Sequence, residues 1–493
     1  MTGSVRTRPT AAGAASRTRH AAATTARWSP PGPGAVDEAL IRGMVANFCL
    51  RHHVPGAIVG LFDTRGPRHT LTVGRLSAEL PAGTVGPSSV FSTYSVAKLL
   101  NASMLCLLHE AGEVDLDAPV TRHLPGLRLR PGTDPDALTL RHLLSNSSGL
   151  VPDRTDHDGL SRNQEDLGRE IVAQVRRLPF VAEPGAVFAY SNAGMSLAGH
   201  VAERATGLGF AELMRERLLE PLGMERTTYD PAVAMTHPLL QHHVIGADGR
   251  PTVAHQPRAG VRHQPAGLCF STVPDLARLG AAHLRQARRP GEPDPVSGLR
   301  GLARAHEPMV DVLVESDLTY GLGTLVTRRG GRRCVGHEGF NPGMWCKLIA
   351  VPAHGVGLVW ADNRGPELRT ERYRVIDRIL AQFGVAPVDR RPAAGPELPA
   401  AAVTGRYVRV GAAPIEVDPS GPDGIRLTCG GRQARLTRSA PQVWSAPAGP
   451  PLEPPWAPHM DSTSLAAGFR IAPASGSVSH LQFNGLPYRR ANG

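Results

Sequence analysis

Hydrophobic and polar positions along residues 35–385 follow two periods. Apolar residues spaced three or four apart predict helices in "AVDEALIRGMVANFCLRHH" and in residues 95–112, 165–178, 193–218 and 273–287. Residues 138–150 predict a short helix followed by a polar turn that ends in Gly149. Short apolar runs bounded by glycine or proline predict strands. They are "AIVGLFD" and "LTVGRL" near the start, and "TYGLGTLV", "CVGHEGF", "WCKLIAVP" and "GVGLVWADN" near the end. A last helix is predicted in "LRTERYRVIDRILAQFG".

Strands at both ends of this region flank a helical middle. This order predicts an α/β (α+β) fold in which one antiparallel sheet is built from both chain ends, is flanked by helices, and has an all-helical lobe inserted. Residues 387–402 have the composition of a linker. Short strands separated by turns follow and predict a small all-β unit. The expected divisions are a disordered basic tail at 1–35, a main domain at 36–386, the linker at 387–402 and the all-β unit at 403–493.

The net charge of +11 is concentrated at the two ends of the chain. The first 36 residues hold five arginines and no acid, and residues from 403 onward hold nine arginines and five acids, which leaves +2 for residues 37–402. Because no basic stripe with interleaved aromatic residues occurs, we expect no nucleic-acid partner.

The N-terminal segment and the cysteines exclude other classes of protein. Residues 1–34 lack the apolar core of a secretory signal, and the chain has no run of 18 apolar residues, so we expect no membrane partner and a cytoplasmic location. The six cysteines are scattered without a C-x-x-C pair and are expected to be free core thiols. The His-His pairs at 52–53 and 242–243 lack metal-site spacing, so no metal and no cofactor are expected.

Lysine usage draws attention to one short segment, "STYSVAKLL". Of the 54 basic Lys and Arg residues only Lys98 and Lys347 are lysine, so a position that merely needs a positive charge is arginine elsewhere in this chain. Unlike a guanidinium, an ammonium can release its proton. Lys98 follows Ser95 by three residues, one helical turn, so its amine can act as a base for the serine hydroxyl. The alternative is a helix-start serine followed by a solvated lysine, and Lys347 is expected to be such a strand-edge or surface lysine.

Two further segments carry candidate chemistry. In "FAYSNAGMSLAGHVAE", the phenol of Tyr190 can relay a proton and the amide of Asn192 can orient a lysine or a substrate carbonyl. The alternative is a helix start capped by Asn192. In "GHEGFNPG", His337 is a titratable donor and the N–H of Phe340 is a candidate oxyanion donor. The alternative there is a tight turn with exposed His337 and Glu338.

The order S-x-x-K, Y-S-N, H-E-G resembles that of the serine β-lactamase and penicillin-binding-protein superfamily, and specifically its class C branch. Residues of about 36–385 carry the resemblance, which extends to "HVPGAIVGLF", "LTLRHLLSNSSGLVPD" and "EPGAVFAYSNAGMSLAG". The unit from residue 403 resembles the small lipocalin-like β-barrel of some members. The resemblance implies the β-lactamase/DD-peptidase-like fold.

The resemblance also implies an acyl-enzyme mechanism on an ester, amide or peptide. Ser95 would attack the carbonyl, Lys98 would accept its proton, Tyr190 would pass the proton on, and Asn192 would hold the lysine and the substrate. The N–H groups of Ser95 and Phe340 would bind the oxyanion. His337, Glu338 and Gly339 would take the place of the third motif, which carries a lysine in β-lactamases.

The third motif departs from that of β-lactamases and leaves the substrate open. If Glu338 faces the cleft, it would repel a β-lactam carboxylate and favour a substrate amine. The activities that the resemblance leaves open are a hydrolase of esters, amides or D-amino peptides and a thioesterase that releases or cyclises nonribosomal peptides. A binding protein on the same scaffold is a third alternative. A small-molecule or peptide substrate is expected, and the oligomeric state is left open.

Overall fold

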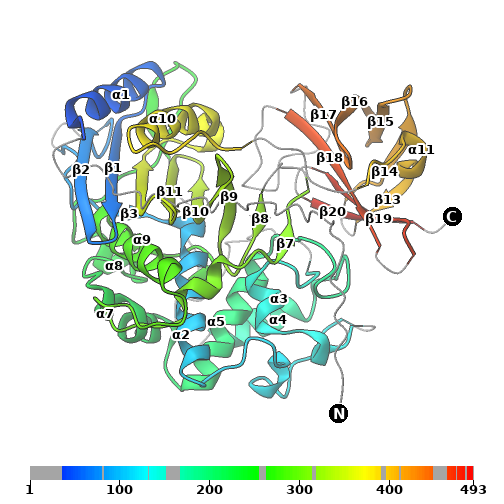
Figure 1. The fold of residues 1–493 in the computed structure, drawn as a ribbon, viewed down its shortest axis with the longest axis horizontal. Helices are drawn as coiled ribbons and strands as arrows, with labels where there is room; N and C mark the ends of the chain where they lie inside the picture. Colours follow the sequence, from blue (N-terminus) through cyan, green and yellow to red (C-terminus); the bar gives the residue numbers. More distant parts are fainter. Residues whose placement is uncertain are drawn as a thin grey trace, which may run out of the picture.

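The computed structural model describes residues 36–79, 83–130, 133–150, 167–254, 263–313, 318–389, 396–409, 412–447, 464–472, 475–483 and 486–491. A body of helices and strands forms one side of the molecule, and a small β-barrel forms the other (Figure 1). The expected tail at 1–35 lies outside the described residues. No helix within them is long and apolar enough to cross a membrane.

One eight-stranded sheet organises the body, and its order is β2-β1-β12-β11-β10-β9-β8-β7. All of its paired strands are antiparallel. β1 therefore pairs with β2 on one side and, on the other, with β12, which lies about 300 residues later, and this confirms the expected sheet built from both ends. The bounds are β1 Gly56–Asp63, β2 Gly66–Gly74, β7 Val310–Asp311, β8 Thr319–Tyr320, β9 Leu325–Arg329, β10 Arg332–Asn341, β11 Met344–Val351 and β12 Val356–Asp362.

Helices cover both faces of this sheet, and the sheet separates two apolar cores. The helices α1 (Glu38–Arg51) and α10 (Arg369–Ala381) pack on one face, where Trp345 and Trp360 lie. On the other face, α2 (Ala97–Glu110) and α9 (Val273–Arg288) share a larger core with the inserted helical lobe. The lobe comprises α3 Leu140–Leu144, α4 Leu167–Val175, α5 Asn192–Thr206, α6 Phe210–Met214, η5 Arg215–Leu219, α7 Glu220–Leu222 and α8 Pro231–Ala234.

Shorter elements connect these parts. They are the 3₁₀ turns η1 Tyr94–Val96, η2 Val120–Arg122, η3 Pro135–Ala137, η7 Leu302–His306 and η8 Pro366–Leu368, and the two-stranded sheets β3 Phe91–Ser92 with β6 Phe270–Ser271 and β4 His243–Ile245 with β5 Pro251–Val253.

The C-terminal unit is a closed barrel, as expected. Eight antiparallel strands follow one another around it, so no strand edge is left open. They are β13 Gly405–Val408, β14 Ile415–Pro419, β15 Gly424–Cys429, β16 Arg432–Ala440, β17 Val443–Pro447, β18 Ser464–Ile471, β19 Val478–Phe483 and β20 Leu486–Arg490, preceded by α11 Ala400–Val403. We propose to keep the division at 386 and 403. Residues 390–395 of the expected linker lie outside the described residues.

The cysteines and the second lysine test two expectations about single residues. All six cysteines are buried and free, as predicted. The expectation for Lys347 is wrong, because β11 is an interior strand and the lysine is only 5% exposed. Burial raises the pKa of the Cys106, Cys269 and Cys334 thiols to about 12.

A buried ion pair joins the sheet to α10. Arg372 donates two hydrogen bonds to the Asp362 carboxylate, at 2.6 and 2.7 Å, and neither residue is exposed. Trp360 Nε1 donates to the same carboxylate at 2.7 Å, and the guanidinium of Arg372 lies over the Trp345 ring. With both partners satisfied, the pair is tolerated in the core; with one removed, the other is an uncompensated buried charge.

Asp362→Ala is therefore expected to lower the free energy of unfolding by about 3–5 kcal/mol, measured as the shift in urea midpoint. The control is Glu292→Gln, which breaks an ion pair whose side chains are 70% and 60% exposed and is expected to cost under about 0.5 kcal/mol. Equal shifts of the urea midpoint for the two variants would contradict the conclusion that the Arg372–Asp362 pair leaves an uncompensated buried charge when one partner is removed.

A chain of hydrogen bonds with a fixed direction crosses the larger core. Ser103 Oγ donates to the Leu99 carbonyl at 2.6 Å, so it accepts from His283 Nε2 at 3.0 Å. When His283 is neutral, its Nδ1 accepts from His306 Nε2 at 2.8 Å. Burial lowers the pKa of His283 to about 4 and holds that of His306 well below its ordinary value.

This chain of hydrogen bonds predicts that the folded protein loses stability in acid. The folded pKa of His283 is depressed, so between pH 6.5 and 4 the unfolded state binds a proton that the folded state does not. Unfolding is then favoured as pH falls, by about 2 kcal/mol for this histidine between pH 7 and pH 5. Urea midpoints across this range should fall less steeply for His283→Gln than for the unchanged protein. An unchanged slope would contradict the prediction.

Candidate active site

The candidate nucleophile lies where a 3₁₀ turn runs into a buried helix. Ser95 is the middle residue of η1, Lys98 is the second residue of α2, and the two share one face of the combined helix. Lys98 Nζ is 3.0 Å from Ser95 Oγ. Ser95 is partly exposed and Lys98 is fully buried. The lysine is thus not the solvated residue of the alternative interpretation.

The Lys98 amine makes two contacts with groups that only accept. Asn192 Oδ1 lies at 2.8 Å and the carbonyl oxygen of Ala266 at 2.6 Å. Two N–H bonds are directed at these acceptors, and the amine also faces Ser95 Oγ. If the amine is neutral, its two hydrogens serve the acceptors and its lone pair is available to the serine hydroxyl.

The second motif reaches the same serine. Tyr190 donates from Oη to Ser95 Oγ at 2.8 Å, and its ring lies 4.7 Å from Lys98 Nζ. Asn192 begins α5, but Ser191 is the N-cap, because its hydroxyl accepts from the Gly194 N–H at 3.1 Å. Asn192 is therefore not the cap, and its side chain is bound to Lys98 instead.

Asn146 holds the segment that carries Tyr190. Its backbone carbonyl accepts from the Ala189 N–H at 2.7 Å, and its side-chain oxygen accepts from the Ser191 N–H at 2.9 Å. Asn146 is fully buried and has φ +53°, a left-handed conformation that asparagine tolerates better than most residues. The N–H groups of both residues that flank Tyr190 are thus bound by one residue.

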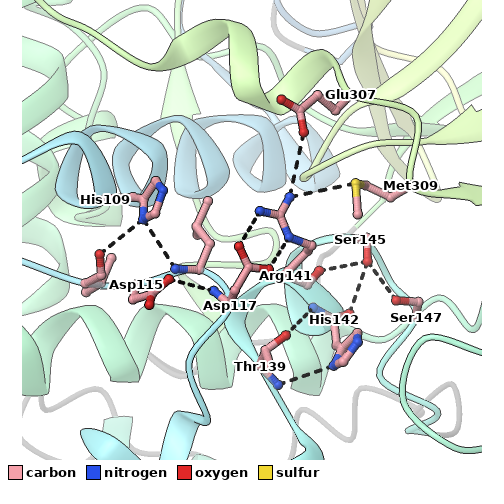
Figure 2. Close-up of polar contacts among 12 residues, drawn as sticks. His109, Asp115, Asp117, Thr139, Arg141, His142, Ser145, Ser147, Glu307 and Met309 are labelled. Atoms are coloured by element: carbon pink, nitrogen blue, oxygen red, sulfur yellow. Dashed lines mark hydrogen bonds and ion pairs between the residues drawn. The ribbon is translucent and has the colours of Figure 1, made fainter. Parts of the chain in front are cut away.

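A polar network fixes the helix before Asn146. In Figure 2, Arg141 lies between the Asp117 and Glu307 carboxylates and Met309. Arg141 binds both Asp117 oxygens, at 2.5 and 2.7 Å. Thr139 and His142 close a capping box at the start of α3, and Ser145 Oγ bonds back to the Arg141 carbonyl at 2.7 Å. These contacts set where α3 ends and hence where Asn146 lies.

The third motif lies on β10, and the strand's alternation separates its residues. His337 is fully buried; its Nδ1 donates to the Glu338 carbonyl at 2.6 Å and its Nε2 is 2.8 Å from Tyr320 Oη. A Cβ on Gly339 would lie 2.6 Å from the Ser95 nitrogen and 2.0 Å from the Thr93 carbonyl, so only glycine allows this approach. The exposed-turn alternative for His337 is therefore wrong.

Glu338 faces the other side of the sheet. Its carboxylate accepts from Arg369 Nε at 2.9 Å and from Tyr373 Oη at 3.0 Å, both on α10, and Lys347 Nζ is 3.8 Å away. Phe340 likewise packs its ring with the core of α1 and α10. The Glu338 carboxylate therefore does not face Ser95, and the expected repulsion of a substrate carboxylate or attraction of a substrate amine by Glu338 is not supported.

Strain is concentrated next to Ser95. Tyr94 has φ +46°, which is rare for a bulky residue, and its hydroxyl lies 2.5 Å from His242 Nε2. Burial raises the pKa of Tyr94 and lowers that of His242 to about 4. Tyr94, held at its hydroxyl, turns the chain so that Ser95 meets both Lys98 and Gly339.

Four residues of this arrangement were given no role in the site from the sequence: Ala266, Tyr320, Asn146 and His242. Ala266 contributes only its backbone oxygen, and Tyr320 acts from a two-residue strand, so neither has a local signal. Asn146 lies in the quoted stretch "LSNSSGL", where an asparagine beside a glycine-ended turn was the available signal.

Comparison with known proteins gives relatives that span most of the chain. It is 29% identical over 377 residues to penicillin-binding protein 4 of Amycolatopsis lactamdurans, covering 74% of this chain and 95% of that protein. It is 26% identical over 327 residues to the unguisins hydrolase ungD' of Aspergillus campestris, covering 64% of this chain and 59% of that protein.

Solved structures share the fold over both units. SurE superposes with a TM-score of 0.72 at 23% identity, covering 92% of this chain and 99% of that one. The octameric penicillin-binding protein homologue of Pyrococcus abyssi gives 0.62 at 20% identity, covering 92% and 100%. The model of the Beta-lactamase family matches residues 37–381. The chain belongs to the Beta-lactamase family, within the superfamily of serine β-lactamases and penicillin-binding proteins.

Proposed function

We propose that this protein is a serine hydrolase of the class C branch that works through an acyl-enzyme on Ser95. Family membership and the hydrolase-named relative support a serine hydrolase in general. The observation that carries the proposal is the position of one serine hydroxyl between two groups, with Lys98 Nζ at 3.0 Å and Tyr190 Oη at 2.8 Å.

The roles follow from what each group can accept or donate. The Ser95 proton moves to Lys98 as Oγ attacks the substrate carbonyl. Tyr190 then donates a proton to the leaving group, which departs as a neutral alcohol or amine, and the proton held by Lys98 returns to Tyr190. The N–H groups of Ser95 and Phe340 bind the oxyanion, and the close approach of Gly339 to Ser95 supports this pairing.

An ester, amide or peptide is the proposed substrate. His337 and its partner Tyr320 are buried at the position of the third motif, and this motif offers no lysine for a β-lactam carboxylate. Water resolves the acyl-enzyme in a hydrolase, whereas a substrate amine would resolve it in a peptide cyclase. The structure of SurE was also solved with D-Leu. Substrates that carry an amino acid are therefore the first to test with this protein.

Labelling with a fluorophosphonate tests the nucleophile. We expect one adduct by intact mass, on Ser95, because its hydroxyl lies between an amine that can act as a base and a phenol that can donate a proton. Ser95→Ala should give no adduct, whereas Ser191→Ala, which removes only the helix cap, should keep it. An adduct on Ser95→Ala would refute the proposal, and an unreactive protein would favour a binding role.

Substitution of the base tests the role of Lys98. Lys98→Arg keeps a cation that cannot release its proton, and Lys98→Met keeps an unbranched side chain, one atom shorter, without a base. Each is expected to fold, by circular dichroism, and to lower the acylation rate by about 10²–10⁴-fold. A rate close to that of the unchanged protein in either folded variant would show that another group is the base.

A further inference from the structure

The barrel packs against the body through an extended interface. Ala466 of β18 is part of the larger core of the body. A Cβ on Gly468 would lie 2.8 Å from Leu313 Cβ, so glycine permits close contact there. His480 Nε2 donates to the Val181 carbonyl at 3.2 Å. Strands β18 and β19 therefore form a packed interface with the body.

Gln482 of β19 makes a deeply buried polar contact in this interface. Its Nε2 donates to the Phe188 carbonyl at 2.9 Å, and its Oε1 accepts from the Leu313 N–H at 3.1 Å. The side chain is 1% exposed. One amide therefore satisfies two buried backbone groups that lie 125 positions apart in the body.

The first of these groups belongs to the segment that carries Tyr190. The peptide between Phe188 and Ala189 has its carbonyl bound by Gln482 and its N–H bound by the Asn146 carbonyl. It is thus held at both ends, by the barrel on one side and by the helical lobe on the other. Tyr190 is the next residue, and its hydroxyl lies 2.8 Å from Ser95 Oγ.

The second group belongs to the strands that carry Tyr320. Leu313 follows β7, and β7 pairs Val310 with Tyr320 of β8. Tyr320 Oη is 2.8 Å from His337, and its ring lies 5.5 Å from that of Phe188. Gln482 therefore connects the segments that place Tyr190 and His337.

We propose that Gln482 is a positioning residue for acyl transfer, through which the barrel holds Tyr190 against Ser95. This inference rests on the proposed function, because it assigns Tyr190 a role in proton transfer. A displacement of Tyr190 Oη by a fraction of an ångström would lengthen its distance to Ser95 Oγ. The reaction would then be slower, while the binding of a small substrate would stay the same.

The test compares Gln482→Glu and Gln482→Met with Arg470→Gln. Gln482→Glu keeps the acceptor for Leu313 but places a carboxylate oxygen against the Phe188 carbonyl. Arg470→Gln removes a contact of the same interface, 3.9 Å from Asp311 with both side chains partly exposed. With a small activated ester, both Gln482 variants should lower kcat about tenfold or more with KM changed less than about twofold. Arg470→Gln should match the unchanged protein.

A rescue by acid separates positioning from folding. When the carboxyl group introduced by Gln482→Glu is protonated, it can donate to the Phe188 carbonyl again, so kcat relative to the unchanged protein should rise as pH falls. Gln482→Met should show no such rise. These ratios are measured on folded protein well below its melting temperature.

Two outcomes are distinguishable. If the unchanged protein is acylated, Ser95→Ala is not, and the Gln482 variants only lose thermal stability, this inference is wrong and the proposed function stands. If Ser95→Ala is still acylated, the proposed function itself is wrong. Should neither variant fold, Gln482→Asn, which shortens the same amide by one carbon, is measured in their place, and an unchanged kcat would overturn the inference.

Discussion

The arrangement of the site depends on how the fully buried amine of Lys98 is satisfied. Two acceptors, Asn192 Oδ1 and the Ala266 carbonyl, come from different parts of the inserted lobe and its connection, while the serine comes from the start of α2. A buried amine without such partners would be costly. The lobe, the helix and the connection must therefore assemble around one nitrogen, and their assembly fixes the position of the amine relative to Ser95, which lies one helical turn away.

The same principle of shared backbone partners extends away from the nucleophile. Asn146 fixes the peptides around Tyr190, Tyr94 bends the chain before Ser95, and Gly339 lets β10 approach the serine nitrogen. None of these three is needed for the chemistry itself. Each brings an element of the fold within hydrogen-bond distance of the reacting group, and this precision is what a pre-organised site requires.

Sequence reasoning succeeded where a motif or a pattern of strands carried the signal, and it failed for individual side chains whose surroundings depend on the folded sheet. Ser95 and Lys98 were predicted to meet because one helical turn joins them, and the sheet was predicted because both chain ends read as strands. The side of β10 on which Glu338 lies could not be predicted, because alternation gives two faces but does not say which one meets Ser95. Lys347 was misjudged for a different reason: β11 is an interior strand because β10 and β12 pair with it on either side, and local sequence does not give the order of strands. Ala266, Tyr320 and Gln482 act across long sequence separations, which no local pattern records.

The six buried thiols have a practical consequence. They are distributed over both cores of the body and over the barrel, at Cys106, Cys269, Cys334 and the three other positions. Protonated and shielded, they are poor nucleophiles in the native state. The order in which these cysteines react with a maleimide during unfolding would therefore show which of the three cores opens first. Peptide mapping of the modified cysteines would give this order without any substitution in the protein.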